Sequence, residues 1–187
     1  MRLTRLLTVG ALILSFAGGT AFAQSDKAKK QAELTKVAAA SLQEFYKHKP
    51  ELKGLVEKST GYGVFTTYGL SFIVGGAGGK GLVHDNKTKK VTYMEMAQAS
   101  AGLQAGVAET KVLILFKDAK GLNSFVTSGW EVGGSGGASA GAGGKMAGSG
   151  AGNAVVADSD YYMLTKNGVQ AGGAVSGTKF WKDKDLN

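Results

Sequence analysis

The spacing of hydrophobic residues changes once along the chain, near residue 60. Between residues 24 and 58 the apolar positions recur every three or four residues, which predicts helix. One stripe of that helix holds Leu34, Val37, Ser41, Leu42 and Phe45, and the opposite face holds Lys29, Lys36 and Lys47. Pro50 predicts the start of a second, short helix, because proline fits the first helical turn. The N-terminal part is therefore expected to be helical and amphipathic.

From Gly61 onward the hydrophobic period falls to two and glycine becomes frequent, which predicts strands. Two interruptions are expected, a turn in "HDNKTKK" at 84–90 and a short helix capped by Asp118. Asn167-Gly168 predicts a hairpin turn between the last two strands. The expected strands lie at 61–69, 70–85, 91–96, 100–109, 111–116, 129–134, 160–164 and 169–177.

Together these elements predict a single α+β domain over residues 24–187. N-terminal amphipathic helices in 24–58 are expected to pack on a glycine-rich antiparallel β-sheet in 61–187, which curls into a barrel-like sheet or sandwich. Half of the residues in the tract 133–152 are glycine. We expect this tract to begin and end as strand and to have a mobile tip.

The first 23 residues have the pattern of a secretory signal peptide. Arg2 and Arg5 precede an apolar run of about a dozen residues, and Ala21-Phe22-Ala23 has the form that signal peptidase cleaves. The apolar run is too short to span a bilayer comfortably. We therefore expect cleavage after residue 23 and a periplasmic protein that can lie peripheral to a membrane.

Lysine supplies all the positive charge that remains after this cleavage. The chain loses its two arginines, so the formal net charge falls from +8 to +6. Proteins that read nucleic acids rely on the bidentate fork of arginine, whereas lysine acts as a point charge. The composition therefore favours diffuse attraction to an anionic surface, and we expect no nucleic-acid partner.

The segment "GGAGGKG" at 75–81 looks like a phosphate-binding loop but does not fit one. A P-loop would need glycine in place of Val74 and a hydroxyl residue in place of Gly81. The overlapping G-x-G-x-x-G match is not followed by a helix whose N-terminus could hold a pyrophosphate. We expect no nucleotide, and we interpret the segment as a close-packed strand and turn. Bulkier residues at Gly76 and Gly78 are then expected to damage folding.

Catalysis and metal binding find little support in the sequence. The two histidines, His48 and His84, lack the spacing of zinc ligands, and the chain has no cysteine. Ser135 and Ser139 match G-x-S-x-G in letters, but both histidines precede them and no helix is expected after them. We expect a protein that is not an enzyme and has no cofactor and no metal.

The order of the glycine-rich pieces resembles the SYLF domain family of lipid-binding proteins. In sequence order the likeness is carried by "GYGVFTTYGLSFIVGGAGGKGLV", "ASAGLQAGV", "VLILF", "SGWEVGG" and "DYYMLTKNGVQAGGAVSGTKF". It extends through the lysine-rich segment "DKAKKQAELTKVAAASLQEF" and so covers nearly all of 24–187. The tract 133–152 departs from the family, which usually has bulkier strand residues there.

The resemblance implies binding of anionic phospholipid, aided by a basic amphipathic N-terminal helix. The lysines that match the basic helix of the family are Lys27, Lys29, Lys30 and Lys36. Residues 80–93 hold four lysines and one acid, so charge adds Lys80, Lys87, Lys89 and Lys90. We expect these eight lysines to face a membrane surface, with Lys80 offered to a lipid phosphate. The alternative is a structural or protein-interaction module of the cell envelope, in which the lysines only solvate the surface.

Overall fold

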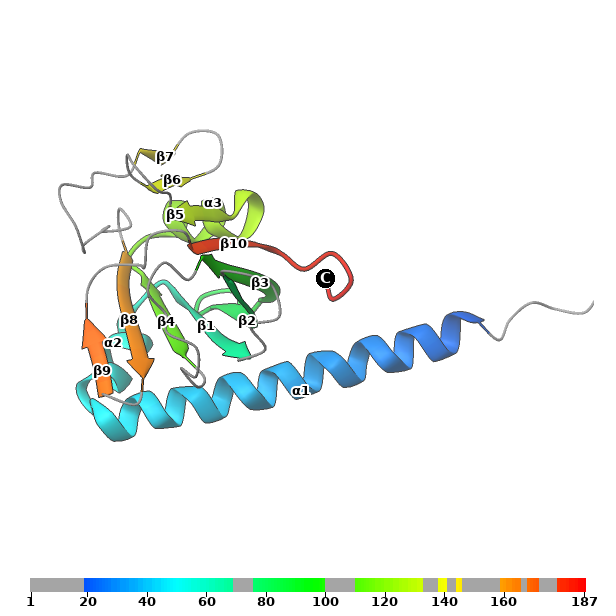
Figure 1. Cartoon of the computed structure of the whole chain (residues 1–187), viewed down its shortest axis with the longest axis horizontal. Coiled ribbons are helices and arrows are strands. Elements are labelled where there is room, and N and C mark those ends of the chain that lie inside the picture. The colour runs from blue at the N-terminus through cyan, green and yellow to red at the C-terminus, as the bar shows by residue number, and fades with distance from the viewer. Residues whose placement is uncertain are drawn as a thin grey trace, which may run out of the picture.

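The computed structural model describes residues 19–68, 76–99, 110–132, 138–140, 144–145, 159–165, 168–171 and 178–187. Within these ranges the chain forms three helices and ten strands (Figure 1). The helices are α1 (Gly19–His48), α2 (Glu51–Lys58) and α3 (Ala119–Ser128). The strands are β1 (Gly61–Tyr68), β2 (Gly76–Asp85), β3 (Val91–Ala99), β4 (Lys111–Phe116), β5 (Trp130–Val132), β6 (Ala138–Ala140), β7 (Gly144–Lys145), β8 (Ser159–Thr165), β9 (Gly168–Ala171) and β10 (Thr178–Lys182).

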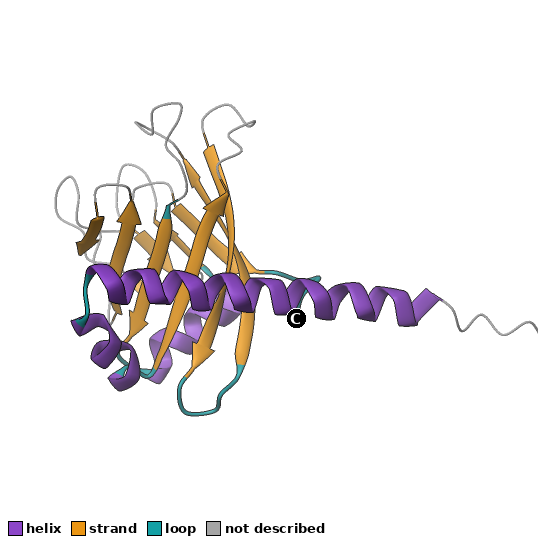
Figure 2. Cartoon of the chain, turned by 90° about the horizontal axis from the view of Figure 1, so that it is seen from below, coloured by secondary structure: helices purple, strands orange, loops and turns teal. Residues whose placement is uncertain are grey.

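The described strands form one sheet in which every hydrogen-bonded pair is antiparallel. Their order is β7-β6-β5-β10-β3-β2-β1-β4-β8-β9. The sheet is curled, and α1 runs across several strands on its outer side (Figure 2). The predicted α+β fold, with N-terminal helices packed on an antiparallel, barrel-like sheet, is confirmed.

Helices α1 and α2 cover the outer face of the sheet with the stripe that the sequence predicts. Leu42 and Phe45 of α1 and Val56 of α2 are buried in one cluster with Leu113 of β4 and Leu164 of β8. Phe45 is fully buried. Because the sheet takes up this apolar stripe, the part of α1 that faces solvent is polar and carries the lysines.

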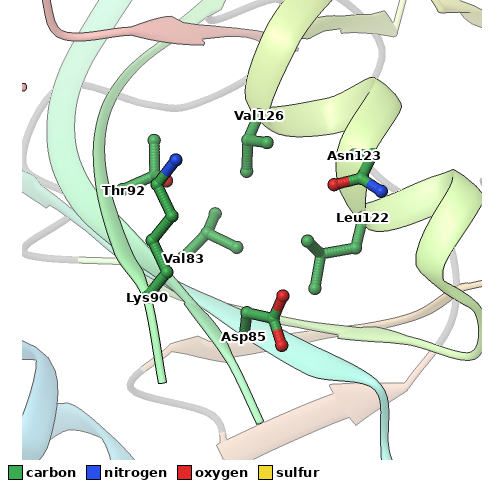
Figure 3. A pocket seen from close by; sticks show the side chains of 7 residues that line it. All are labelled: Val83, Asp85, Lys90, Thr92, Leu122, Asn123 and Val126. Carbon is green, nitrogen blue, oxygen red and sulfur yellow. The ribbon is translucent and has the colours of Figure 1, made fainter. Parts of the chain in front are cut away.

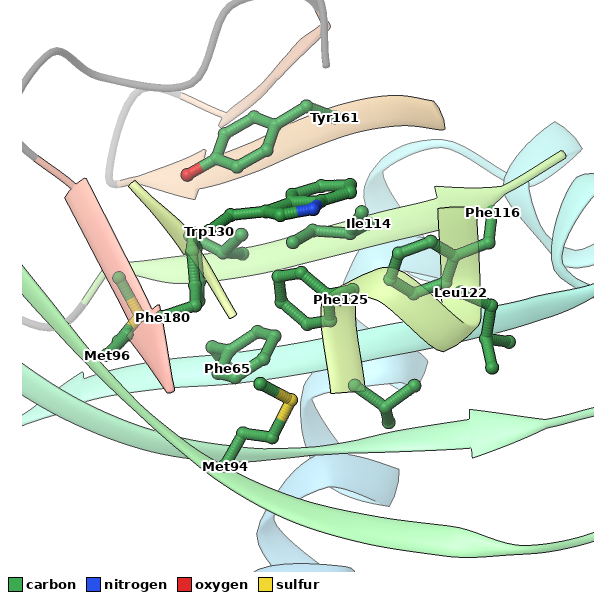
Figure 4. Close-up of a cluster of buried hydrophobic side chains, with 12 residues drawn as sticks. Phe65, Met94, Met96, Ile114, Phe116, Leu122, Phe125, Trp130, Tyr161 and Phe180 are labelled. Carbon is green, nitrogen blue, oxygen red and sulfur yellow. The ribbon is translucent and has the colours of Figure 1, made fainter. Parts of the chain in front are cut away.

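Helix α3 lies on the inner face, where its Phe125 packs among aromatic rings from the strands (Figure 4). Asp118 caps the helix as predicted, because its Oδ1 accepts a hydrogen bond from the backbone N–H of Gly121 at 2.6 Å. The ring of Phe125 is fully buried, and its centroid lies 4.5 Å from that of Trp130 and 5.2 Å from that of Phe116. The Phe125 ring of α3 thus packs among aromatic rings that the strands supply, and together they fill the inner face.

Strand β10 is not predicted from the sequence. Its sequence, "TKFWK", is short and contains two lysines, yet the strand pairs with both β3 and β5 in the interior of the sheet. Thr178 and Phe180 are buried while Lys179 between them is exposed, as expected for a strand. The predicted strand at 100–109 lies outside the described residues, and so does most of the tract 133–152.

The described glycines of "GGAGGKG", from Gly76 onward, lie in β2, and two of them are needed for close packing. A Cβ at Gly79 would lie 2.6 Å from the carbonyl oxygen of Thr66, and one at Gly81 would overlap the carbonyl oxygen of Val64. The interpretation as a close-packed strand is therefore confirmed, but the expectation for Gly78 is wrong. A Cβ at Gly78 would meet nothing within 4 Å, because alternate residues of a strand point to opposite sides.

Candidate functional site

The four predicted lysines of α1 differ in how they are placed. Lys29, Lys30 and Lys36 are exposed, and none of them has an ion-pair partner among the described residues. Lys27 is half-buried, and its Nζ donates a hydrogen bond to the backbone oxygen of Asn187 at 2.8 Å. Three of these ammonium groups are therefore available to an external anion, and the fourth contacts the C-terminal segment.

Lys80 is held by two carboxylates of the protein itself. Its Nζ lies 2.8 Å from Oε1 of Glu95 and 2.8 Å from Oδ2 of Asp183. Burial alone would lower the pKa of Lys80, but the hydrogen bonds and charges of Asp183 and Glu95 outweigh it and raise that pKa. Contact of Lys80 with a lipid phosphate stays a prediction, and it would require the phosphate to compete with both ion pairs.

The β2–β3 turn presents three predicted lysines, Lys87, Lys89 and Lys90, all of them exposed. Asp85 shapes the turn, because its Oδ1 accepts hydrogen bonds from the backbone N–H groups of Lys87 at 2.8 Å and Thr88 at 2.9 Å. These hydrogen bonds lower the pKa of Asp85, and the bond from Thr88 has the largest effect. The Asp85 carboxylate thus bonds the backbone of its own turn, and the three exposed lysines follow it on a backbone that these bonds hold.

The same turn is hydrogen-bonded to the C-terminal end of α2. The side-chain amide of Asn86 donates hydrogen bonds to the backbone oxygens of Val56 at 2.8 Å and Ser59 at 3.0 Å. His84 stacks on Tyr62 with 5.2 Å between ring centroids, and its Nδ1 lies 3.2 Å from the Oδ1 of Asn86. His84 is therefore a packed residue of the outer face.

Two hollows lie near the lysines of this part of the molecule. One, of about 50 Å³, lies between α3 and strands β2 and β3 and is lined by Asp85, Lys90 and Asn123 with apolar neighbours (Figure 3). The other, of about 230 Å³, is an open groove beside Leu55, Lys58 and Lys117.

In the described ranges no three His, Cys, Asp or Glu side chains come together as metal ligands would. No helix in those ranges is long and apolar enough to cross a bilayer.

The structure does not bring the eight predicted lysines into one cluster. The lysines of α1 lie on the outer helix, those of 87–90 lie in a turn at one end of the sheet, and Lys80 pairs with the C-terminal segment. Three exposed lysines near the turn were not predicted, Lys58, Lys117 and Lys120. Lys58 is the last residue of α2, Lys117 follows β4 and Lys120 lies in the first turn of α3. No short segment of the sequence therefore holds all three together with the lysines of the turn.

The chain is similar to known proteins over most of its length. Residues 97–187 match the family model Ysc84, described as "Las17-binding protein actin regulator". A relative from Aeromonas veronii, "Beta cell expansion factor A", is 32% identical over 152 residues. The match covers 80% of this chain and 56% of the relative, so the chain spans little more than half the length of that protein.

Proposed function

Residues 97–187 belong to the SYLF family, whose model is named Ysc84, and we propose that this protein binds membrane surfaces that contain anionic phospholipid. The family is known for lipid and actin-related binding, and its members are binding domains. In this proposal the protein acts without catalysis and from the periplasm, after removal of residues 1–23.

The observation that carries the proposal is a set of exposed lysines without carboxylate partners. Within the described part of the chain, six of the eight predicted lysines are exposed and form no ion pair: Lys29, Lys30, Lys36, Lys87, Lys89 and Lys90. A lysine near an anionic leaflet contributes about 1 kcal/mol, so about four to six of them give a useful affinity. Exposed charges are screened by salt, so this affinity must fall as the ionic strength rises.

The proposal is tested by sedimentation with vesicles. The purified protein is mixed with phosphatidylcholine vesicles that either contain or lack one-third phosphatidylglycerol, at salt concentrations from about 0.05 M to about 0.5 M. We expect the protein to pellet only with the anionic vesicles and to be released as salt is added. A folded sample that pellets with neither vesicle would overturn the proposal in favour of an envelope interaction module.

A further inference from the structure

Several chain segments that carry lysines end together at one edge of the sheet. The register places Gly61 opposite both Asp85 and Phe116, so α2 enters β1 at the edge where β2 and β4 end. Backbone hydrogen bonds connect the segments just beyond this edge, from Thr60 N to the oxygen of Phe116 at 2.9 Å and from Asn86 N to the oxygen of Thr60 at 3.0 Å. In Figure 2 this is the lower edge, where the β2–β3 turn extends below the sheet near α2.

We call this edge the lysine rim and define it by Lys58, Lys87, Lys89, Lys90, Lys117 and Lys120. All six are exposed. Lys117 pairs with Asp160 at 2.8 Å, and the other five form no ion pair among the described residues. The rim therefore gathers ammonium groups from α2, the β2–β3 turn and the start of α3 on one side of the molecule.

The carboxylates at this edge are largely engaged within the protein. Asp85 accepts hydrogen bonds from its own turn, and Asp118 accepts one from the backbone of α3 at 2.6 Å. Asp160 is paired with Lys117. Glu57, in the last turn of α2, is an exposed acid beside Lys58. An approaching anion thus meets five lysines that form no ion pair among the described residues, and Glu57 is the one exposed acid named here without such a partner.

An exposed apolar side chain accompanies these charges. Leu55 of α2 is 40% exposed. Among the described residues it is the one large hydrophobic side chain that is exposed to solvent. It borders the open groove of about 230 Å³ whose other walls include Lys58, Phe116 and Lys117. An apolar side chain flanked by ammonium groups suits the boundary between phospholipid phosphates and acyl chains.

We propose that the lysine rim, with Leu55, is the face that docks on an anionic phospholipid bilayer. This inference rests on the proposed function and adds the orientation of the protein on the membrane. Helix α1 cannot provide the apolar part of such a contact, because its stripe through Leu42 and Phe45 is buried against the sheet. The rim offers both charge and an exposed leucine, whereas no large hydrophobic side chain is exposed among the described side chains of α1.

Two triple variants with the same change in charge test this orientation. The rim variant is Lys58→Gln/Lys87→Gln/Lys90→Gln, and the control on α1 is Lys29→Gln/Lys30→Gln/Lys36→Gln. With about a five-fold loss for each lysine at the membrane, we expect about 100-fold weaker partition into phosphatidylglycerol vesicles for the rim variant. The α1 variant is expected to lose less than about three-fold, because its lysines act only from a distance.

The outcomes separate this inference from the proposed function. If the unmodified protein does not bind the vesicles, the proposed function itself fails. If it binds and the α1 variant loses as much affinity as the rim variant, or more, the proposed function stands and the rim assignment is overturned. Circular dichroism of each variant shows whether it is folded, and the substituted side chains are all exposed.

A labelling experiment tests the contact directly and does not depend on charge. The chain has no cysteine, so single cysteines can carry an environment-sensitive fluorophore. We expect a blue shift on anionic vesicles with the label at Leu55→Cys and none at Gln43→Cys, an exposed position on α1. A shift at position 43 without one at position 55 would overturn the proposed orientation.

Discussion

The Nζ of Lys80 lies 2.8 Å from the Oδ2 of Asp183, and this ion pair joins β2 directly to the segment after β10. The same Nζ pairs with Glu95 of β3, whose other oxygen accepts a hydrogen bond from the indole N–H of Trp181 at 2.7 Å. Only 3% of the Asp183 side chain is exposed. A lysine from a glycine-rich segment that looks like a phosphate loop therefore neutralises a buried carboxylate of its own protein.

Removing the Lys80 ammonium should destabilise the fold. In Lys80→Met the buried Asp183 would lose its cation, and a buried charge without a partner is costly. Because 44% of the Lys80 side chain is exposed, solvent moderates the loss, and we expect the free energy of unfolding to fall by about 1–3 kcal/mol. Urea unfolding followed by circular dichroism measures the change.

The matched control for this prediction is Lys179→Met. Lys179 pairs with Glu131 at 3.3 Å, but both side chains are more than half exposed. Exposed ion pairs contribute about 0–1 kcal/mol, so the control should keep nearly all its stability. Equal losses in the two variants would show that the burial of Asp183 is not what makes the Lys80 pair important.

The contribution of Asp183 should depend on pH in one direction. Burial alone would raise the pKa of Asp183, but the hydrogen bond and charge of Lys80, with two backbone N–H groups, lower it below its ordinary value. A carboxylate whose pKa is lower in the folded state stabilises the fold above its unfolded pKa of about 3.9, and loses this effect as the pH falls through its folded pKa.

The measurement compares the protein with Asp183→Asn in urea at several pH values. We expect the protein to be more stable than the variant by a constant amount between about pH 7 and pH 5, and the difference to shrink below about pH 4. Other carboxylates titrate in both proteins and cancel in the comparison. A difference that grows as the pH falls would contradict the assigned role of the Asp183 charge.

Local patterns were enough to predict most of the elements. The stripe ending at Phe45 and the cap at Asp118 are determined by residues close in sequence, and both lie where the pattern places them. Strand β10 was missed because its extended conformation depends on pairing with Met94–Gln98 of β3, which is far away along the chain. Local propensity gives little signal for a short segment whose partners are so distant.

The candidate site could be predicted only as a distribution of charge. The density of lysine in 80–93 correctly marks the exposed residues Lys87, Lys89 and Lys90, but it also includes Lys80, which has two internal partners. Whether a lysine is free depends on carboxylates such as Asp183, about a hundred residues away. The rim lysines at the ends of α2 and β4 come together through sheet register, which composition does not contain.

Alanine at Gly81 and at Gly78 should have opposite consequences although the two residues lie in the same strand. A methyl group at Gly81 would overlap the carbonyl oxygen of Val64 and the ring of Phe65, so β1 and β2 would have to separate. We expect a loss of about 2–4 kcal/mol, or no folded protein. Gly78→Ala has open space, and its smaller unfolded-state entropy should leave stability unchanged or raise it by up to about 1 kcal/mol.

Thermal unfolding of the two alanine variants checks the difference. A shift in the melting temperature that is equal for Gly78→Ala and Gly81→Ala would contradict the close approach of β1 and β2. Gly79→Ala supplies a second test at the same interface, because its Cβ would lie 2.6 Å from the oxygen of Thr66. It should resemble Gly81→Ala and not Gly78→Ala.

Phe125 should be the residue on which the inner core depends most. Its ring is fully buried and lies within 4.5–6.0 Å, between centroids, of four other rings, those of Phe65, Phe116, Trp130 and Phe180. Phe125→Ala would leave a cavity among these four rings, so we expect a loss of about 3–5 kcal/mol.

The neighbouring Val126, which is only partly buried against the same cluster, provides the control. Val126→Ala should cost about 1 kcal/mol, because less apolar surface is lost. Near-ultraviolet circular dichroism adds a local readout, because the Phe125 ring contacts the indole of Trp130 edge-to-face and fixes its surroundings. A Phe125→Ala protein that keeps both its stability and its tryptophan signal would mean that α3 does not fill the inner face of the sheet.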